Sequence, residues 1–141
     1  MKRLGTLIKL QKSLVDDQRR MLADLQNIQG RIEAEIAALE AARLHEEDVA
    51  RHAEPEAMVT PAPFMAKTRA RLEQLTKALA DAAEAVEIAR DKLAELFETQ
   101  KRYEIIRDRR AAEEAAEASR RDRMELDEIA ETGHQRKTRR D

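Results

Sequence analysis

The sequence predicts an all-α protein in which two long helices form an antiparallel coiled-coil hairpin and the second helix overhangs the first. Three observations lead to this fold class. Charged residues make up 40% of the 141 residues and aromatic residues only 2%, a composition typical of long helices and coiled coils. Apolar residues recur every three or four positions. All the prolines fall in one short segment that separates two periodic stretches.

Residues 1–53 are expected to form the first coiled-coil helix, because good helix formers dominate and the first proline is Pro55. Two series of residues spaced by seven are expected to form its seam. One series contains Leu4, Gln11, Gln18, Leu25, Ile32 and Leu39, and the other contains Leu7, Leu14, Met21, Ile28, Glu35 and Ala42.

Residues 54–63 are expected to form the hairpin tip, because they contain all the prolines of the chain. Thr60 followed by Pro61 resembles a helix N-cap with proline at the first helical position.

Residues 64–132 are expected to form a longer return helix that ends at Gly133. Its predicted seam consists of Met65, Leu72, Leu79, Val86 and Leu93 in one series and Leu75, Ala82, Ala89, Leu96 and Tyr103 in the other. Because this helix is longer than the first, it should have no partner within the chain from about residue 111 onward, and residues 133–141 are expected to form a basic disordered tail.

Polar side chains interrupt the seam near the open end of the hairpin, at Gln11, Gln18 and Gln100. Two interpretations remain open. Polar seam residues can fix the register of a coiled coil at a cost in stability, or this end packs loosely and docks on another surface.

Larger apolar residues reappear on the unpaired arm at Met124, Leu126 and Ile129. Exposed apolar side chains on a helix are what helix-in-groove recognition uses. These residues are the strongest indication of a protein-binding surface in the sequence.

Several function classes find no support in the sequence. A thin helical rod offers no concave pocket for catalysis or for a small-molecule substrate, so no enzyme activity and no cofactor are expected. There is no cysteine, and His45 and His52 lie in a solvated acidic run rather than in a metal-binding arrangement. No apolar stretch is long enough to span a membrane. The balance of 27 basic and 29 acidic residues disfavours nucleic acid as a partner.

Two segments resemble a known family. The stretch Phe97 to Arg110, FETQKRYEIIRDRR, and the later segment Met124 to Ala130, MELDEIA, are similar to the C-terminal half of the flagellar export protein FliJ family. The layout agrees over the whole chain: a helix, a proline-containing tip and a longer return helix. The chain differs from the family early in the return helix, where Leu72, Leu75 and Leu79 stand at positions that can hold an aromatic residue.

The resemblance implies a cytoplasmic component of the flagellar type III protein export apparatus, peripheral to the inner membrane at the flagellar base. Family members act as a stalk that enters the hexameric export ATPase ring, contacts the cytoplasmic domain of the export gate and handles substrate chaperones. By this resemblance, Asp127 and Glu128, with the apolar residues beside them, map to contact with the ring. Leu72, Leu75 and Leu79 map to contact with the gate.

Two alternatives stay open at this point. The equivalent stalk of a virulence-type secretion system would have the same fold. A nucleic-acid-associated coiled coil would use the terminal cluster Arg136, Lys137, Arg139 and Arg140, and its binding would fall steeply with salt.

Overall fold

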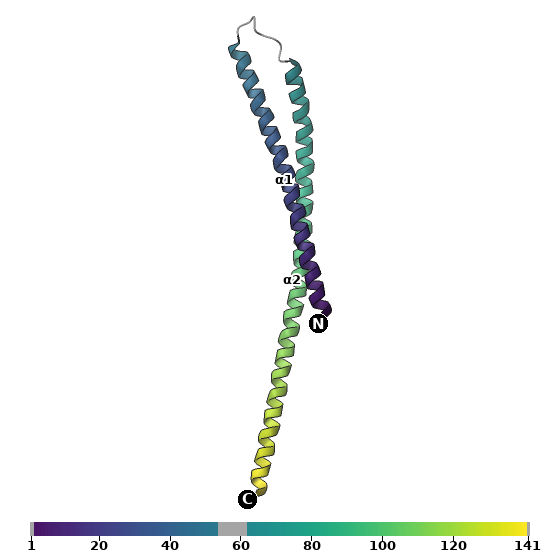
Figure 1. Cartoon of the computed structure of the whole chain (residues 1–141), viewed down its shortest axis with the longest axis vertical. Helices are drawn as coiled ribbons and strands as arrows, with labels where there is room; N and C mark the ends of the chain where they lie inside the picture. Colours follow the sequence, from purple (N-terminus) through teal and green to yellow (C-terminus); the bar gives the residue numbers. More distant parts are fainter. Residues whose placement is uncertain (1, 54–61, 141) are drawn as a thin grey trace. The chain divides into compact units, whose positions relative to one another are not determined.

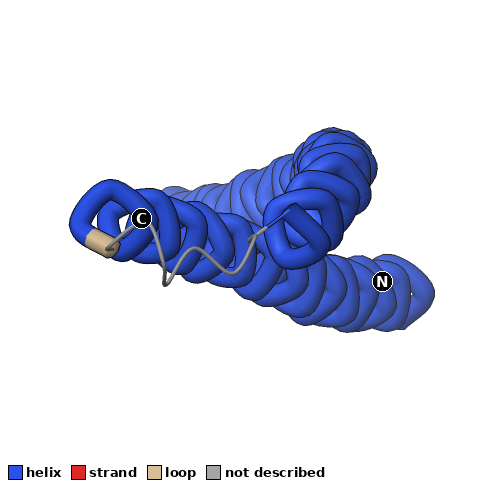
Figure 2. Tube along the Cα trace, turned by 90° about the horizontal axis from the view of Figure 1, so that it is seen from above, coloured by secondary structure: helices blue, strands red, loops and turns tan. Residues whose placement is uncertain are grey.

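Two helices account for nearly all of the part of the chain that the computed structural model describes, residues 2–53 and 62–140. They are α1, Lys2–His52, and α2, Ala62–Arg140, drawn in purple to blue and in teal to yellow in Figure 1. Figure 2 shows that only a short loop at the end of α1 lies outside them within the described ranges. Most of the predicted tip, residues 54–61, lies outside the described residues, and Ala62 and Pro63 already belong to α2.

Contacts divide the chain into two compact units. The hairpin unit is Ser13–Phe97, and the terminal unit combines Met1–Lys12 with Glu98–Asp141. In the hairpin unit, α1 and α2 pack against each other in opposite directions (Figure 1). The predicted all-α antiparallel hairpin is therefore confirmed.

The seam of α2 is the one that its sequence predicts. Both heptad series are buried or half-buried along their whole predicted length, from Met65 to Tyr103. The most deeply buried members are Leu75, Val86 and Ala89. Thr68 joins them, and its hydroxyl donates to the carbonyl of Phe64 at 2.9 Å, so its burial leaves no unmet polar group.

The predicted seam of α1 is right in one series and, in the other, wrong at every member except Ala42, which is half-buried. The series that contains Leu4 and Leu25 is buried or half-buried, as expected, but Leu7, Leu14, Met21 and Ile28 are exposed. The second buried series lies one residue later and consists of Ile8, Val15, Leu22, Gln29 and Ile36. The two candidate series lie on either side of the Leu4 series around the helix. The observed choice leaves Glu35 at the surface, where its carboxylate pairs with Arg71 at 2.8 Å. Burial of that carboxylate in the seam would have carried a desolvation cost.

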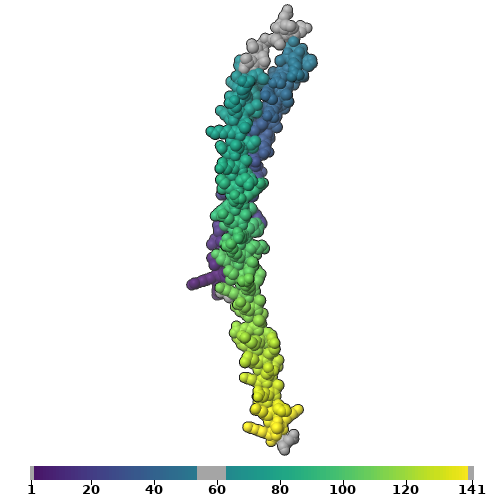
Figure 3. All heavy atoms as spheres, turned by 180° about the vertical axis from the view of Figure 1, so that it is seen from behind, coloured from purple at the N-terminus to yellow at the C-terminus, as the bar shows by residue number. Residues whose placement is uncertain are grey.

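In the terminal unit, burial is limited to a few positions. On α1 they are Leu4, Ile8 and Gln11, and on α2 they are Thr99, Gln100, Tyr103 and Glu104. From residue 105 to residue 139 every side chain of α2 is exposed. In Figure 3 the yellow end of this segment is a single helix with no other segment on the face shown. We call residues 105–139 the arm.

The end of α2 differs from the sequence expectation. The helix continues through Gly133 to Arg140, whereas the sequence predicts an end at residue 132 and a disordered tail. Gly133 does not adopt the positive φ that ends many helices. A glycine with helical φ only weakens a helix, by about 1 kcal/mol relative to alanine, so the following residues can remain helical.

Candidate protein-binding surfaces

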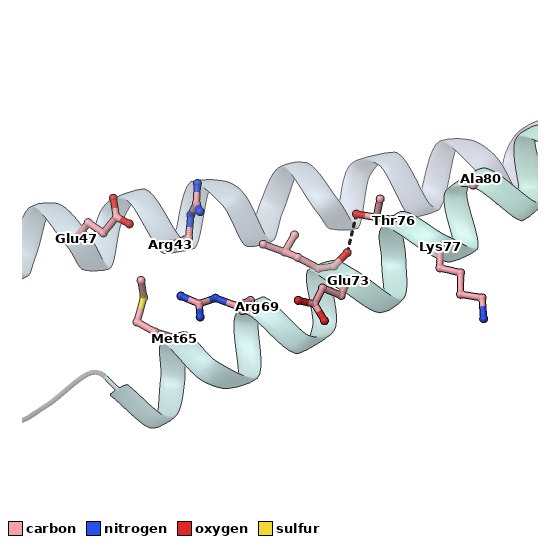
Figure 4. Close-up of a pocket in the computed structure, with 9 residues that line it drawn as sticks. Arg43, Glu47, Met65, Arg69, Glu73, Thr76, Lys77 and Ala80 are labelled. Carbon is pink, nitrogen blue, oxygen red and sulfur yellow. Dashed lines mark hydrogen bonds between the residues drawn. The ribbon is translucent and has the colours of Figure 1, made fainter.

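A groove opens on one side of the hairpin unit, close to the start of α2 (Figure 4). Arg43 and Glu47 of α1 face it from one side, and Met65, Arg69 and Glu73 of α2 from the other. Leu72, Thr76, Lys77 and Ala80 complete its lining. The groove therefore combines a small apolar floor with charges of both signs, which suits a protein partner better than an apolar small molecule.

Leu72, Leu75 and Leu79, which the resemblance maps to gate contact, belong to the seam of α2. Leu75 is only 4% exposed, and Leu72 and Leu79 are half-buried. Their side chains hold α2 against α1, so a partner can reach little of Leu75. Of the three, only Leu72 lines the groove.

Met124, Leu126 and Ile129 are strongly exposed on the arm, at 62%, 64% and 68%. They do not form one stripe. Leu126 and Ile129 are three residues apart and share a side of the helix, whereas Met124 is two residues from Leu126 and projects from a different side.

Asp127 and Glu128 are also exposed and lie three and four residues after Met124. They therefore share its side of the helix. The arm thus presents an apolar side with Leu126 and Ile129, and an acidic side on which Met124 is the apolar residue.

The polar seam residues behave differently from one another. Gln18 donates from Nε2 to the carbonyl oxygen of Ala89 at 3.1 Å, which links α1 to α2 within the hairpin unit. A bond of this kind favours one register of the two helices. Gln100 donates to Glu104 of its own helix at 3.0 Å. The Oε1 atom of Gln11 is buried and has no hydrogen-bond partner among the described residues.

Local contacts lower the pKa of the Glu104 carboxyl. The hydrogen bond from Gln100 Nε2 at 3.0 Å is the main cause that lowers the pKa of Glu104 below its ordinary value. Lys101, whose Nζ lies 3.4 Å from the carboxylate, and the charge of Arg107 act in the same direction, while partial burial opposes them. These contacts within α2 favour the ionised form of the Glu104 carboxyl.

The seam between α1 and α2 has two sides in the hairpin unit, and a contact between the helices identifies each side. On one side, Arg71 bonds Glu35 Oε1 through Nε at 3.1 Å and through Nη2 at 2.8 Å. On the other side, the guanidinium of Arg19 lies 4.9 Å from the ring centroid of Phe97. We call these the Glu35 flank and the Arg19 flank.

Sequence reasoning missed one set of surface residues. Leu14, Met21 and Ile28 were assigned to the seam, yet they lie exposed on the Glu35 flank. Their separation from Glu35 by multiples of seven was the available signal, because a glutamate in the same series indicates a position outside the core.

Other kinds of site find no support among the described residues. No group of three or more His, Asp or Glu side chains there could hold a metal ion. His52 bonds the carbonyl of Asp48 through Nδ1 at 2.9 Å, which is a local helical contact. No described helix is apolar over a long enough window to cross a membrane.

Comparison with known proteins agrees with the helical layout. The family model described as flagellar FliJ protein matches residues 1–139. Searches among curated proteins and among solved structures gave no significant match. Because the family model covers nearly the whole sequence, the chain belongs to the flagellar FliJ protein family, whose members are non-enzymatic components of the flagellar export apparatus.

Proposed function

We propose that this chain is the stalk of the flagellar type III export apparatus. In this proposal the arm enters the hexameric export ATPase ring, the groove end of the hairpin unit contacts the cytoplasmic domain of the export gate, and the chain handles substrate chaperones. It acts in the cytoplasm, peripheral to the inner membrane at the flagellar base. The observation that carries the proposal is the arm, a long helix whose described side chains are all exposed.

The arm has the properties that a ring-binding segment requires. Leu126 and Ile129 expose apolar surface that a ring subunit could cover. Charges of both signs alternate along the rest of the arm, and one pair, Arg121 with Glu117, forms an ion pair at 3.4 Å. A surface of this kind stays hydrated and does not stick to a ring lumen over its whole length.

The proposed gate contact is better supported at the groove than at the three seam leucines. Arg69 and Glu73 reach the groove from α2 (Figure 4), whereas Leu75 is buried against α1. We therefore place the gate contact on the groove that Leu72 lines, with Leu75 and Leu79 supporting it from beneath.

The decisive experiment for the ring contact uses purified hexameric export ATPase. Adding the full chain should raise ATP hydrolysis by the ring, while the chain alone should hydrolyse no ATP. A chain truncated after Arg123 should fail to stimulate, because it lacks Leu126 and Ile129. The double variant Leu126→Ala and Ile129→Ala should lose most of the stimulation.

The matched control is Leu44→Ala, which removes a leucine of similar exposure from α1 of the hairpin unit and should leave stimulation unchanged. Equal stimulation by the full and truncated chains would exclude the part of the arm beyond Arg123 as the ring contact. Circular dichroism of each variant checks that the hairpin is intact.

The gate contact is tested by binding to the purified cytoplasmic domain of the export gate. Arg69→Glu should weaken binding, because it reverses a charge that lines the groove. Arg90→Glu, on α2 outside the groove, is the matched charge reversal and should bind like the unmodified chain. Equal affinities for the two variants would remove the groove from the proposal and leave the ring contact untouched.

A further inference from the structure

One apolar heptad series of α1 remains unused by the hairpin unit. Leu14, Met21 and Ile28 follow one another at intervals of seven residues and are 38%, 55% and 45% exposed. Single exposed apolar residues are common on protein surfaces. Residues at a heptad interval are different, because they form a continuous line along one side of a helix in a coiled coil.

The ion pair between Glu35 and Arg71 shows which residues of α2 lie beside this line. Glu35 belongs to the same heptad series as Ile28, so α2 residues in the series of Arg71 lie along the same flank. Steps of seven from Arg71 lead to Ala78 and Ala85, both half-buried small residues. Ile88 follows Ala85 by three residues, which places it on the adjoining side of α2, and it is 62% exposed.

In the described part of the chain, the Arg19 flank has no comparable line of exposed apolar residues. Steps of seven from Arg19 lead along α1 to Gln26 and Glu33, and steps from Phe97 lead back along α2 to Arg90 and Ala83. Apolar surface is therefore concentrated on the Glu35 flank. The α2 residues beside Met21 and Ile28 on this flank are the small residues Ala78 and Ala85.

Acidic residues outnumber basic ones along the edges of this surface. Asp17 and Asp24 follow Leu14 and Met21 by three residues on α1, and Asp81 and Glu95 lie on the corresponding side of α2. The cations on the same edges are Arg31 and Lys92.

Some of these charges are already compensated within the chain. Asp17 pairs with Arg20 at 3.8 Å, and Glu95 pairs with Lys92 at 3.9 Å. Asp24 and Asp81 form no ion pair within the described part of the chain. Arg31 also forms no ion pair among the described residues, so two acidic charges, Asp24 and Asp81, stand against one basic charge and the balance at the edges is negative.

We propose that the Glu35 flank of the hairpin unit, formed by Leu14, Met21, Ile28, Ala78, Ala85 and Ile88, binds an amphipathic helix of a partner protein whose apolar stripe is edged by Lys and Arg. A helix can supply one apolar layer for every seven residues, about 10.5 Å apart, and so match the spacing of Leu14, Met21 and Ile28. Basic edges would face Asp24 and Asp81. A second copy of this chain is disfavoured, since it would set acidic edges against acidic edges.

This binding surface uses neither the arm nor the groove and so goes beyond the proposed stalk contacts. A chain truncated after Arg123 should bind the helix as the full chain does. The ring contact can therefore fail its test while helix binding to the Glu35 flank passes, and the reverse is also possible.

The test begins in cells that make the full chain with a photo-crosslinking amino acid at Ile88. The matched position on the Arg19 flank is Gln26. After illumination, the crosslinked peptides are identified by mass spectrometry. The Ile88 site should capture a partner segment with apolar residues every three or four positions and Lys or Arg beside them, and the Gln26 site should not capture it.

The captured segment is then synthesised and its affinity for the purified chain measured. The double variant Met21→Glu and Ile28→Glu should weaken binding at least about tenfold, whereas Gln26→Glu should not. Both substituted side chains are substantially exposed, so the hairpin should still fold, which thermal unfolding checks. No adduct at Ile88, an adduct only to a second copy of this chain, a captured segment with acidic edges, or equal affinities of the two variants would overturn the inference.

Discussion

Two stretches of α2 are both helical and both contain apolar residues, but one packs against α1 and the other is exposed. Between residues 65 and 97 the helix buries or half-buries a residue every three or four positions against α1, including Leu75, Val86 and Ala89. Between residues 105 and 139 every side chain is exposed, including Met124, Leu126 and Ile129. Both stretches are helical throughout.

The difference shows that helix formation and packing are separate requirements. The first stretch is stabilised by burial of its apolar face. The arm depends on alanine-rich composition and on pairs such as Glu117 with Arg121 at 3.4 Å, which contribute only about 0.3–0.5 kcal/mol each. The buried apolar residues of the first stretch therefore serve the fold, whereas exposed ones such as Leu126 and Ile129 of the arm are free to bind a partner.

The largest expected difference in the free energy of unfolding is between two variants, each of which removes an apolar side chain from one of the two stretches. Leu75→Ala should lower the free energy of unfolding by about 2–5 kcal/mol, because it empties a buried seam position. Leu126→Ala should change it by no more than about 0.5 kcal/mol, because the side chain is exposed. Urea unfolding followed by circular dichroism measures both. Similar losses for the two variants would mean that the arm is packed.

A smaller effect is expected at the polar seam position Gln18. Gln18→Ala should lower the free energy of unfolding by about 1–1.5 kcal/mol, since it removes the hydrogen bond to the carbonyl of Ala89. The control Gln26→Ala removes an exposed glutamine from the same helix and should have almost no effect. Equal values for the two variants would show that the bond does not stabilise the paired stretch.

The two helix-interior glycines Gly30 and Gly133 offer a matched pair. Apart from its chain neighbours and the nearby backbone of its own helix, a Cβ atom at either position would meet nothing within 4 Å, so alanine should be tolerated at both. Gly30→Ala should raise the free energy of unfolding of the hairpin by about 0.5–1 kcal/mol. Gly133→Ala should raise the helical signal of the arm and leave the midpoint of hairpin unfolding in place. If Gly133→Ala shifts that midpoint, the arm and the hairpin do not unfold independently.

The smallest effect concerns pH. Because the folded-state pKa of Glu104 is lowered, its carboxylate stabilises the folded chain fully above its unfolded-state pKa, and this contribution disappears as pH falls through the lower folded-state pKa. The difference in unfolding free energy between the unmodified chain and Glu104→Gln should thus shrink below pH 4 or so. Urea titrations at several pH values measure it. A difference in unfolding free energy that stays constant with pH would contradict a lowered pKa of Glu104 in the folded chain.

Much of the fold was predictable from residue patterns. The proline segment separates the helices, and the seam of α2 followed from Met65 through Tyr103 because only one pair of heptad series there is consistently apolar. The exposed arm followed from the unequal helix lengths. The continuation past Gly133 was not predicted, because glycine at a helix end is compatible with both a stop and a weak helical position.

The candidate surfaces were harder to predict. The sequence identified Met124, Leu126 and Ile129 as a group, and helix geometry then separated Met124 from the other two. It also directed attention to Leu75, which is buried. The groove could not be predicted, because it depends on which side chains of α1 meet which side chains of α2.

The sequence by itself determined that this chain forms two helices, where they separate, and which face of α2 is apolar. Only the tertiary structure decided which face of α1 meets α2. Three heptad series on α1, those of Leu4, Leu7 and Ile8, are apolar over much of their length and adjoin one another around the helix. A single partner helix covers two of them, so the packing of α2 assigned the Ile8 series to the core and left Leu14, Met21 and Ile28 on the surface.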